Sequence, residues 1–306
     1  MDKKPLGKSN IYVSELTLGC MSLGTDKKQA NEIINKALDM GINHLDTADL
    51  YDFGLNETIV GEAIKNKRDQ VVLTTKVGNH FNRTRKDWFW DPSKQHIQNG
   101  IKESLHRLQT DYIDLYLLHG GTIEDNIDES IEAFEQLKKE GLIRAYGISS
   151  IRPNVIKKYV ERSNIDAVML QYNILDRRPE EQILDLLKEH RISVLARGSL
   201  AKGIFSSRET LQRKGKDYNF NYSLKELEAV FDQLETLAAQ FNLSTSGLLF
   251  QYVLNHYAVE SAVFGVSSIT QLKANMNAYL QSKKRVIPID KIMNITKAVY
   301  YSEHRI

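Results

Sequence analysis

Residues 112–119 read YIDLYLLH, and residues 127–140 read IDESIEAFEQLKKE. The first stretch is mostly apolar, which is typical of a strand that is buried on both faces. The second stretch places apolar residues at helical spacing with charges between them, as in a helix that covers a sheet. A strand followed by such a helix predicts parallel strands joined by crossover helices.

The same pair of segments recurs along the whole chain of 306 residues. We predict strands in eight segments, each followed by a helix: 16–19, 42–46, 71–76, 112–119, 143–150, 167–172, 193–197 and 260–265. Eight such units in one chain predict an α/β fold, a closed (β/α)8 TIM barrel that forms a single domain over residues 1–306. An open doubly wound sheet is the alternative.

Three segments lie outside the eight units. Residues 3–13 predict an N-terminal hairpin that closes the barrel bottom. Residues 224–241 predict an extra helix before the last unit, and residues 288–304 predict a C-terminal helix.

The composition excludes several classes of protein. A formal net charge of +2 gives no reason to expect nucleic acid or an anionic membrane as partner. No stretch is long and apolar enough to span a bilayer, the N-terminus has no apolar signal core, and the expected location is the cytoplasm. The histidines are scattered, so no metal site is predicted, and the single Cys20 is expected to be a small buried residue. The sequence leaves the oligomeric state open.

Polar side chains end three consecutive predicted strands. These are Asp46, Lys76 and His119, and Tyr51 follows in the loop after Asp46. Each residue alone also has a plain structural interpretation. Asp46 could cap a turn, and Lys76 could be a surface lysine. His119 could be a core histidine, and Tyr51 could pack in the pocket. Together they matter more, because the carboxyl ends of barrel strands meet at one mouth.

This set of side chains suits proton donation. A tyrosine has a pKa of about 10, and a lysine cation beside it lowers that value. Asp46 would position Lys76, and His119 would polarise a substrate carbonyl or help to relay a proton. A tuned general acid suits protonation of an alkoxide that forms as hydride reaches a carbonyl, and a nicotinamide must supply the hydride.

At this point the sequence resembles the aldo-keto reductase family over nearly its whole length. The resemblance implies a bacterial-type NAD(P)H-dependent reductase of small-molecule carbonyl compounds, with Asp46, Tyr51, Lys76 and His119 as catalytic residues and Tyr51 as the general acid. The segments that carry it are LGKSNIYVSELTLGCMSLG, LDTADLYDFGLNETIVGEAI, LTTKVG and DYIDLYLLHGG.

The resemblance also implies cofactor-binding residues around the mouth. Ser149, Ser150 and Gln171 would hold the nicotinamide carboxamide, although Ser150 stands where the family usually has Asn. Arg197 stands where an aromatic ring often stacks on the nicotinamide, and a planar guanidinium can also stack. Two further groups of residues would complete the site. Gly19, Cys20 and Met21 would lie beneath the ribose, beside Asp46. The residues around the pyrophosphate would be Gly198, Ser199, Leu200, Lys202 and Gly203.

The segment FGVSSITQLKANMNA resembles the adenosine-binding segment and opens a helix, whose N-terminus favours phosphate. Its matching positions are Gly265, Ser267, Ser268, Gln271 and Asn275. Many NADPH-selective members carry Lys or Arg at Gly265, Ser268 and Gln271. NADPH is the predicted cofactor, with NADH as a possible one.

The substrate side of the pocket is less specified. The loop NHFNRTRKDWFWDPS holds Trp88 and Trp90, which predict either a pocket wall or packing on the barrel rim. Asp52 follows Tyr51 where glycine is common, and it would alter the pocket rim. The competing functions are a non-catalytic cofactor-sensing subunit and a lyase that forms a Schiff base on Lys76.

Overall fold

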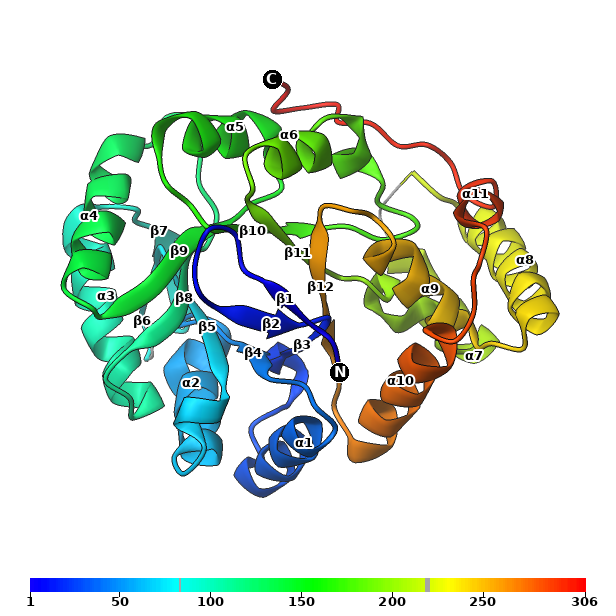
Figure 1. Cartoon of the computed structure of the whole chain (residues 1–306), viewed down its shortest axis with the longest axis horizontal. Coiled ribbons are helices and arrows are strands. Elements are labelled where there is room, and N and C mark those ends of the chain that lie inside the picture. The colour runs from blue at the N-terminus through cyan, green and yellow to red at the C-terminus, as the bar shows by residue number, and fades with distance from the viewer. Residues whose placement is uncertain (83, 218–220) are drawn as a thin grey trace.

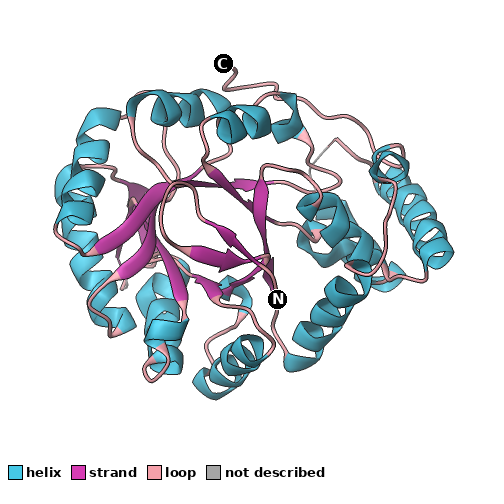
Figure 2. Cartoon of the chain, in the orientation of Figure 1, coloured by secondary structure: helices cyan, strands magenta, loops and turns pink. Residues whose placement is uncertain are grey.

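A computed structural model describes residues 1–82, 84–217 and 221–306. Eight parallel strands close into a barrel, and helices surround it (Figures 1 and 2). The predicted TIM barrel is therefore confirmed. The barrel strands are β3 (Leu16–Gly19), β4 (His44–Asp46), β5 (Val72–Val77), β8 (Ile113–Leu118), β9 (Ile143–Ser149), β10 (Ala167–Gln171), β11 (Ser193–Arg197) and β12 (Val259–Gly265).

Alternation along β8 shows why the strands are apolar throughout. Leu115 and Leu117 point into the barrel core, whereas Tyr116 and Leu118 pack in the outer layer between the barrel and the helices. Both faces of each strand are thus removed from water, as in other parallel sheets covered by helices. This burial explains the continuous apolar runs in the sequence.

The helices follow the strands in chain order. Helix α8 begins with a capping box in which Ser223 and Glu226 satisfy each other's backbone N–H groups. The helices are α1 (Lys27–Asp39), α2 (Leu55–Ile64), α3 (Lys94–Leu108), α4 (Ile127–Lys139), α5 (Pro153–Arg162), α6 (Ile183–Glu189), α7 (Arg208–Lys214), α8 (Leu224–Phe241), α9 (Thr245–Leu254), α10 (Ile269–Ser282) and α11 (Ile289–Met293).

Two helices differ from the sequence prediction in length. The predicted C-terminal helix over 288–304 shortens to the five residues of α11. The sequence predicts a helix from Glu180 to His190 after the strand at 167–172, whereas the structure has a 3-10 turn at Arg178–Glu181 followed by the shorter α6. No helix among the described residues is both long and apolar enough to cross a membrane.

The N-terminal hairpin closes one end of the barrel, as predicted. Its strands β1 (Lys3–Pro5) and β2 (Tyr12–Ser14) pair antiparallel, and the hairpin lies across the centre of the ring in Figure 1. Leu6, Ile11 and Val13 pack against the inward-facing barrel residues. This end is therefore plugged, and chemistry is left to the opposite end.

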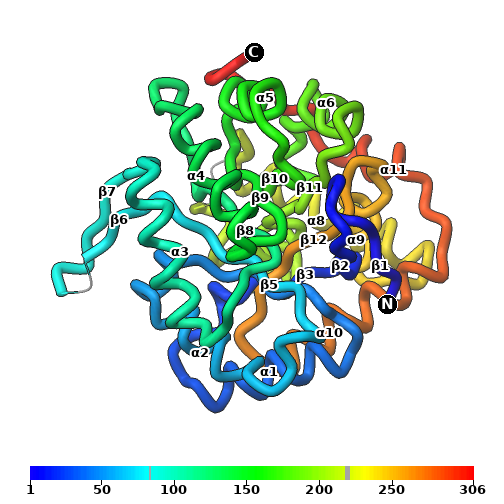
Figure 3. The backbone as a smooth tube through the Cα atoms, turned by 60° about the vertical axis from the view of Figure 1, so that its left-hand side comes forward, coloured from blue at the N-terminus to red at the C-terminus, as the bar shows by residue number. Residues whose placement is uncertain are grey.

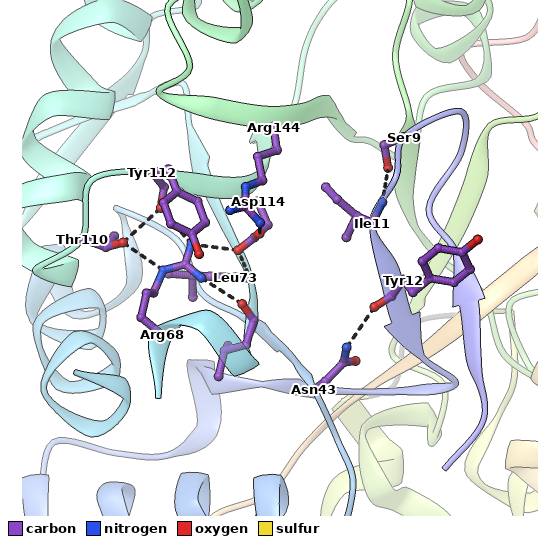
Figure 4. Close-up of polar contacts among 11 residues, drawn as sticks. Ser9, Ile11, Tyr12, Asn43, Arg68, Leu73, Thr110, Tyr112, Asp114 and Arg144 are labelled. Carbon is purple, nitrogen blue, oxygen red and sulfur yellow. Dashed lines mark hydrogen bonds and ion pairs between the residues drawn. The ribbon is translucent and has the colours of Figure 1, made fainter. Parts of the chain in front are cut away.

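An ion-pair cluster around the buried Asp114 ties the loops together at the plugged end (Figure 4). Asp114 accepts from Arg68 at 2.8 Å and from Arg144 at 3.1 Å, and it also accepts from the backbone of Leu73. Both guanidinium groups lie about the Tyr112 ring, at 4.0 and 3.9 Å from its centroid. This cluster is self-contained and serves stability, since barrel chemistry lies at the other end.

A second hairpin replaces the loop expected after the third strand. Strands β6 (Asn79–Asn82) and β7 (Asp87–Trp90) pair antiparallel directly after β5. Figure 3 shows this hairpin projecting from the body of the barrel beside α3. The tryptophans of the polar loop are therefore strand residues.

His44 makes barrel stability depend on pH. It is fully buried on β4, where its two ring nitrogens lie 2.7 Å from the hydroxyls of Thr17 and Thr74. Burial, with Lys76 adding, lowers the pKa of His44 to about 3. The unfolded chain takes up the proton near pH 6.5, so the free energy of unfolding should fall as pH falls from about 6.5 towards 3, by up to about 1.4 kcal/mol per pH unit.

The matched test is a pair of variants, His44→Gln and the exposed His106→Gln. Urea unfolding of each at several pH values should show a shallower acid loss for His44→Gln and an unchanged one for His106→Gln. An acid loss in His44→Gln as steep as in the parent would refute the assignment.

Candidate active site

The loop after β4 is fixed to the neighbouring strand by its own backbone. Asp46 ends β4, and the amides of Thr47 and Asp49 donate to the carbonyls of Thr74 and Lys76 on β5. Tyr51 follows one short turn later and faces the end of β5. The sequence-predicted Asp46, Tyr51 and Lys76 are thus brought together at the carboxyl ends of the strands.

Lys76 uses its three N–H donors on three different groups. Its Nζ lies 2.6 Å from Asp46 Oδ1, 2.7 Å from the Thr47 carbonyl oxygen and 3.3 Å from the Tyr51 hydroxyl. The side chain is only 1% exposed. Burial lowers the pKa of Lys76, but Asp46 and then Tyr51 raise it more, and the net shift is upward. Lys76 is therefore a buried cation in contact with the phenol.

Tyr51 is a protonated phenol in this arrangement. Burial raises its pKa above the ordinary value, and the charge of Lys76 offsets only part of that rise. The sequence prediction of a lowered tyrosine pKa is therefore wrong as a net effect, because desolvation of the phenolate outweighs the lysine. A neutral phenol beside a cation can still give up its proton, because the cation stabilises the phenolate that is left.

His119 faces the phenol from the next strand. Its backbone amide donates to the Val77 carbonyl, and its ring lies edge-on to Tyr51 with 5.8 Å between the centroids. Burial lowers the pKa of His119 to about 3, with Lys76 and Arg197 adding to the effect. The imidazole is therefore neutral and can donate one hydrogen bond to a carbonyl oxygen.

Sequence reasoning missed two groups near this set. The Thr47 carbonyl is a ligand of the Lys76 ammonium, which no side-chain pattern could reveal. Asp49 lies buried under the same loop, and burial, with Glu57 adding, raises its pKa well above the usual range. The second aspartate of the stretch DTADLY was its only signal in the sequence.

The predicted nicotinamide residues lie at the same mouth. Ser149 and Ser150 are nearly buried at the end of β9. Gln171 ends β10 and Arg197 ends β11, and the two strands are paired there, with Arg197 Nη1 donating to Gln171 Oε1 at 3.0 Å. The Ser150 hydroxyl accepts from the Arg152 amide at 3.2 Å, so it helps to shape the turn.

The residues predicted to lie beneath the ribose are at the end of β3 and directly after it, and they differ in exposure to solvent. Gly19 pairs with Asp46 across the sheet. Cys20 is fully buried, and its thiol donates to the Leu18 carbonyl, as expected of a small core residue. Met21 is 63% exposed. Only Met21 of the three presents a side chain to solvent.

The predicted pyrophosphate segment is a run of tight turns after β11. Gly198, Ala201, Lys202 and Gly203 all have positive φ, at 68°, 48°, 56° and 74°. The amides of Ala201 and Gly203 close these turns on the carbonyls of Gly198 and Leu200, and concave backbone turns of this kind are places where proteins hold anions. The Ser199 hydroxyl instead donates to Val263 at 2.9 Å, so that side chain serves the fold. Leu200 lies between Gly198 and the 3-10 turn Ala201–Ser206, which it directly precedes.

The predicted adenosine residues gather at the start of α10. Ser268 caps the helix and accepts from the Gln271 amide, while the Gln271 side chain accepts from Ser267. Gly265 ends β12, where a Cβ would lie 2.7 Å from Ser22 Oγ. Asn275 lies further along α10 and is partly exposed.

These donors fit a nicotinamide dinucleotide. Hydroxyl and amide groups at Ser149 and Gln171 suit a carboxamide, the turns from Gly198 to Gly203 suit a pyrophosphate, and the N-terminus of α10 suits a phosphate. The three groups end neighbouring strands on the same rim. When bound, the cofactor would supply hydride beside Tyr51.

The two tryptophans have different surroundings. Trp90 packs at the strand ends, where Cβ atoms on Gly78 and Gly120 would lie 2.6 and 3.1 Å from its ring, and its Nε1 donates to Asp125. Trp88, two residues earlier on the same strand, is 55% exposed. Trp90 therefore packs on the rim, and Trp88 does not.

Asp52 and Phe53 lie in the loop after β4, on the side of the mouth that the β6–β7 hairpin occupies. Asp52 and Phe53 both have positive φ, at 48° and 52°, and Asp52 is exposed. Phe53 meets Phe81 of the β6–β7 hairpin edge-on at 6.0 Å. The loop after β4 and the hairpin thus meet beside Tyr51.

Comparison with known proteins identifies the family. A model described as the aldo/keto reductase family matches residues 15–295. The chain belongs to this family. As an aldo/keto reductase it is an NAD(P)H-dependent oxidoreductase of a family that acts on small carbonyl compounds.

Similar proteins support the aldo/keto reductase assignment. An oxidoreductase of Bacillus subtilis, YqkF, is 50% identical, with all of both chains covered. An NADH-specific methylglyoxal reductase of Escherichia coli is 29% identical, over 91% of this chain and 93% of that protein. The holo form of aldo-keto reductase AKR11C1 from Bacillus halodurans is 50% identical with a TM-score of 0.92, covering 100% of this chain and 99% of that one.

Proposed function

We propose that this enzyme reduces aldehydes and ketones to alcohols with hydride from NADPH, and that Tyr51 is the general acid. The contact of Lys76 Nζ with both Asp46 and the Tyr51 hydroxyl carries the proposal. It supplies a proton donor and, beside it, the charge that stabilises the donor's conjugate base.

In the proposed reaction a carbonyl oxygen lies between the Tyr51 hydroxyl and the His119 imidazole. As hydride adds to the carbonyl carbon, negative charge develops on the oxygen. His119 donates a hydrogen bond to it, and the Tyr51 proton moves to the same oxygen to complete the alcohol. Lys76 then faces a phenolate, which recovers its proton from water.

The geometry argues against a Schiff-base lyase. That chemistry needs a lysine whose pKa is depressed, so that the neutral amine can attack. Lys76 has a raised pKa and three hydrogen-bond acceptors. Borohydride in the presence of a carbonyl substrate should leave Lys76 unmodified, as mass spectrometry would show.

The choice of NADPH rests on the α10 terminus. A helix N-terminus flanked by the Ser267 and Ser268 hydroxyls favours a phosphate, although Gly265, Ser268 and Gln271 carry no charge. Fluorescence titration should give a lower Kd for NADPH than for NADH. Equal Kd values for the two would overturn this preference.

A charge added at this terminus should sharpen the preference. Gln271→Arg places a guanidinium where a 2′-phosphate would lie and should tighten NADPH by about tenfold, the gain of one charge-assisted bond. NADH binding should change less than about twofold, because NADH lacks that phosphate. Gln271→Met is the neutral control. Equal tightening of NADH and NADPH by Gln271→Arg would argue against the assigned position of the phosphate.

A further inference from the structure

Three side chains outside the active site meet where the β6–β7 hairpin joins α3. His80 lies on β6, Asp91 follows β7, and His96 lies in the first turn of α3. One ligand atom from each lies within 4.8 Å of the other two. Asp91 Oδ2 is 3.5 Å from His80 Nδ1 and 4.0 Å from His96 Nδ1.

The three groups are held in place by their neighbours. The His80 ring is stacked between Phe89, at 4.7 Å, and His96, at 4.9 Å. The other oxygen of Asp91 accepts from the Ser93 amide at 3.1 Å. Asp91 Oδ2 is thus directed at both imidazoles.

His96 is the member that the fold does not explain. Its side chain is only 15% exposed, and its Nε2 is buried without a hydrogen-bond partner among the described residues. Its Nδ1 is 4.0 Å from Asp91, too far for a hydrogen bond.

We propose that His80, Asp91 and His96 form a binding site for a divalent ion of the Zn²⁺ class. Two imidazole nitrogens and one carboxylate oxygen are a donor set that zinc accepts, whereas Ca²⁺ and Mg²⁺ prefer oxygen ligands alone. Zinc bonds of about 2.0–2.2 Å place tetrahedral ligands about 3.4 Å apart. Closing the site on an ion would bring the ligand atoms nearer by up to about 1.4 Å and turn one imidazole out of the stack, so that both rings direct a nitrogen at the ion. His80 is half-exposed, which leaves an entry path and a fourth position for water.

The ion would join the hairpin to the barrel body. The hairpin carries Trp90, whose ring packs on Gly78 and Gly120 at the mouth. An ion bound by His80 on β6 and Asp91 after β7 would hold both strands of the hairpin, and His96 would join them to α3. Metal binding should therefore protect the hairpin from proteolysis.

The test uses untagged enzyme from which metal has been removed with a chelator. Zn²⁺ binding is measured by titration calorimetry, and Co²⁺ binding is measured by the visible absorption of the bound ion. One ion should bind per chain. His80→Asn and His96→Asn should each weaken binding by more than about tenfold. His106→Asn, an exposed histidine on the same helix, is the matched control and should bind as the parent does.

A second readout separates binding from folding. Zn²⁺ should slow tryptic cleavage at Arg85 and Lys86 in the parent and not in His96→Asn, with circular dichroism confirming that the variant is folded. Asp91→Asn repeats the test without removing an imidazole. Absence of Zn²⁺ binding by the parent would overturn the proposal, and so would binding that survives in the folded double variant His80→Asn/His96→Asn.

Discussion

Tyr51→Phe is expected to lower kcat for aldehyde reduction by about 10²–10⁴-fold, the range that one general acid contributes. The substitution removes only the hydroxyl that lies 3.3 Å from Lys76 Nζ. The ring and its edge-on contact with His119 remain, so the Kd for NADPH should stay close to that of the parent. Steady-state kinetics and cofactor titration measure the two effects separately.

The matched control is Tyr257→Phe, because Tyr257 is an exposed tyrosine outside the mouth. It should retain the parent's kcat. Full activity in Tyr51→Phe would mean that another group donates the proton. The acid assignment would then fail even if the reductase activity stands.

Lys76→Met should destabilise the enzyme as well as inactivate it. Asp46 is buried at the end of β4, and removal of Lys76 takes away the cation that contacts its carboxylate. Breaking one partner of a buried ion pair costs about 3–5 kcal/mol in the free energy of unfolding. The turnover should fall at the same time, because the phenolate of Tyr51 loses its stabilising charge.

The double variant Asp46→Asn/Lys76→Met separates these two effects. It removes both charges, so urea unfolding should show most of the lost stability restored, whereas turnover should remain low. A double variant no more stable than Lys76→Met would show that the ion pair is not the source of the loss. Lys76→Met with the same free energy of unfolding as the parent would likewise show that the ion pair does not contribute to stability.

The barrel and the strand-end residues were predictable because they depend on local pattern. Apolar runs such as VVLTTK mark the strands. Asp46 ends β4, Lys76 lies one residue before the end of β5, and His119 directly follows β8. Parallel strands force their carboxyl ends onto one rim. The convergence of these side chains thus follows from topology alone.

The remaining features depend on contacts that pattern does not encode. The strands β6 and β7 have only four residues each and are separated by a run of charged residues, so the sequence of the hairpin resembles a loop. The upward shift of the Tyr51 pKa follows from how deeply the phenol is buried, which the order of residues does not state. His80, Asp91 and His96 meet only because the hairpin folds back on α3.

Single-turnover hydride transfer tests the central claim most directly. Enzyme saturated with NADPH is mixed with p-nitrobenzaldehyde, and the loss of nicotinamide absorbance is followed by stopped flow. We predict rapid transfer by the parent, and transfer by Tyr51→Phe that is slower by about 10²-fold or more with NADPH still bound. Equal rates in the two proteins, or no transfer by the parent to any carbonyl of a broad panel, would contradict the account.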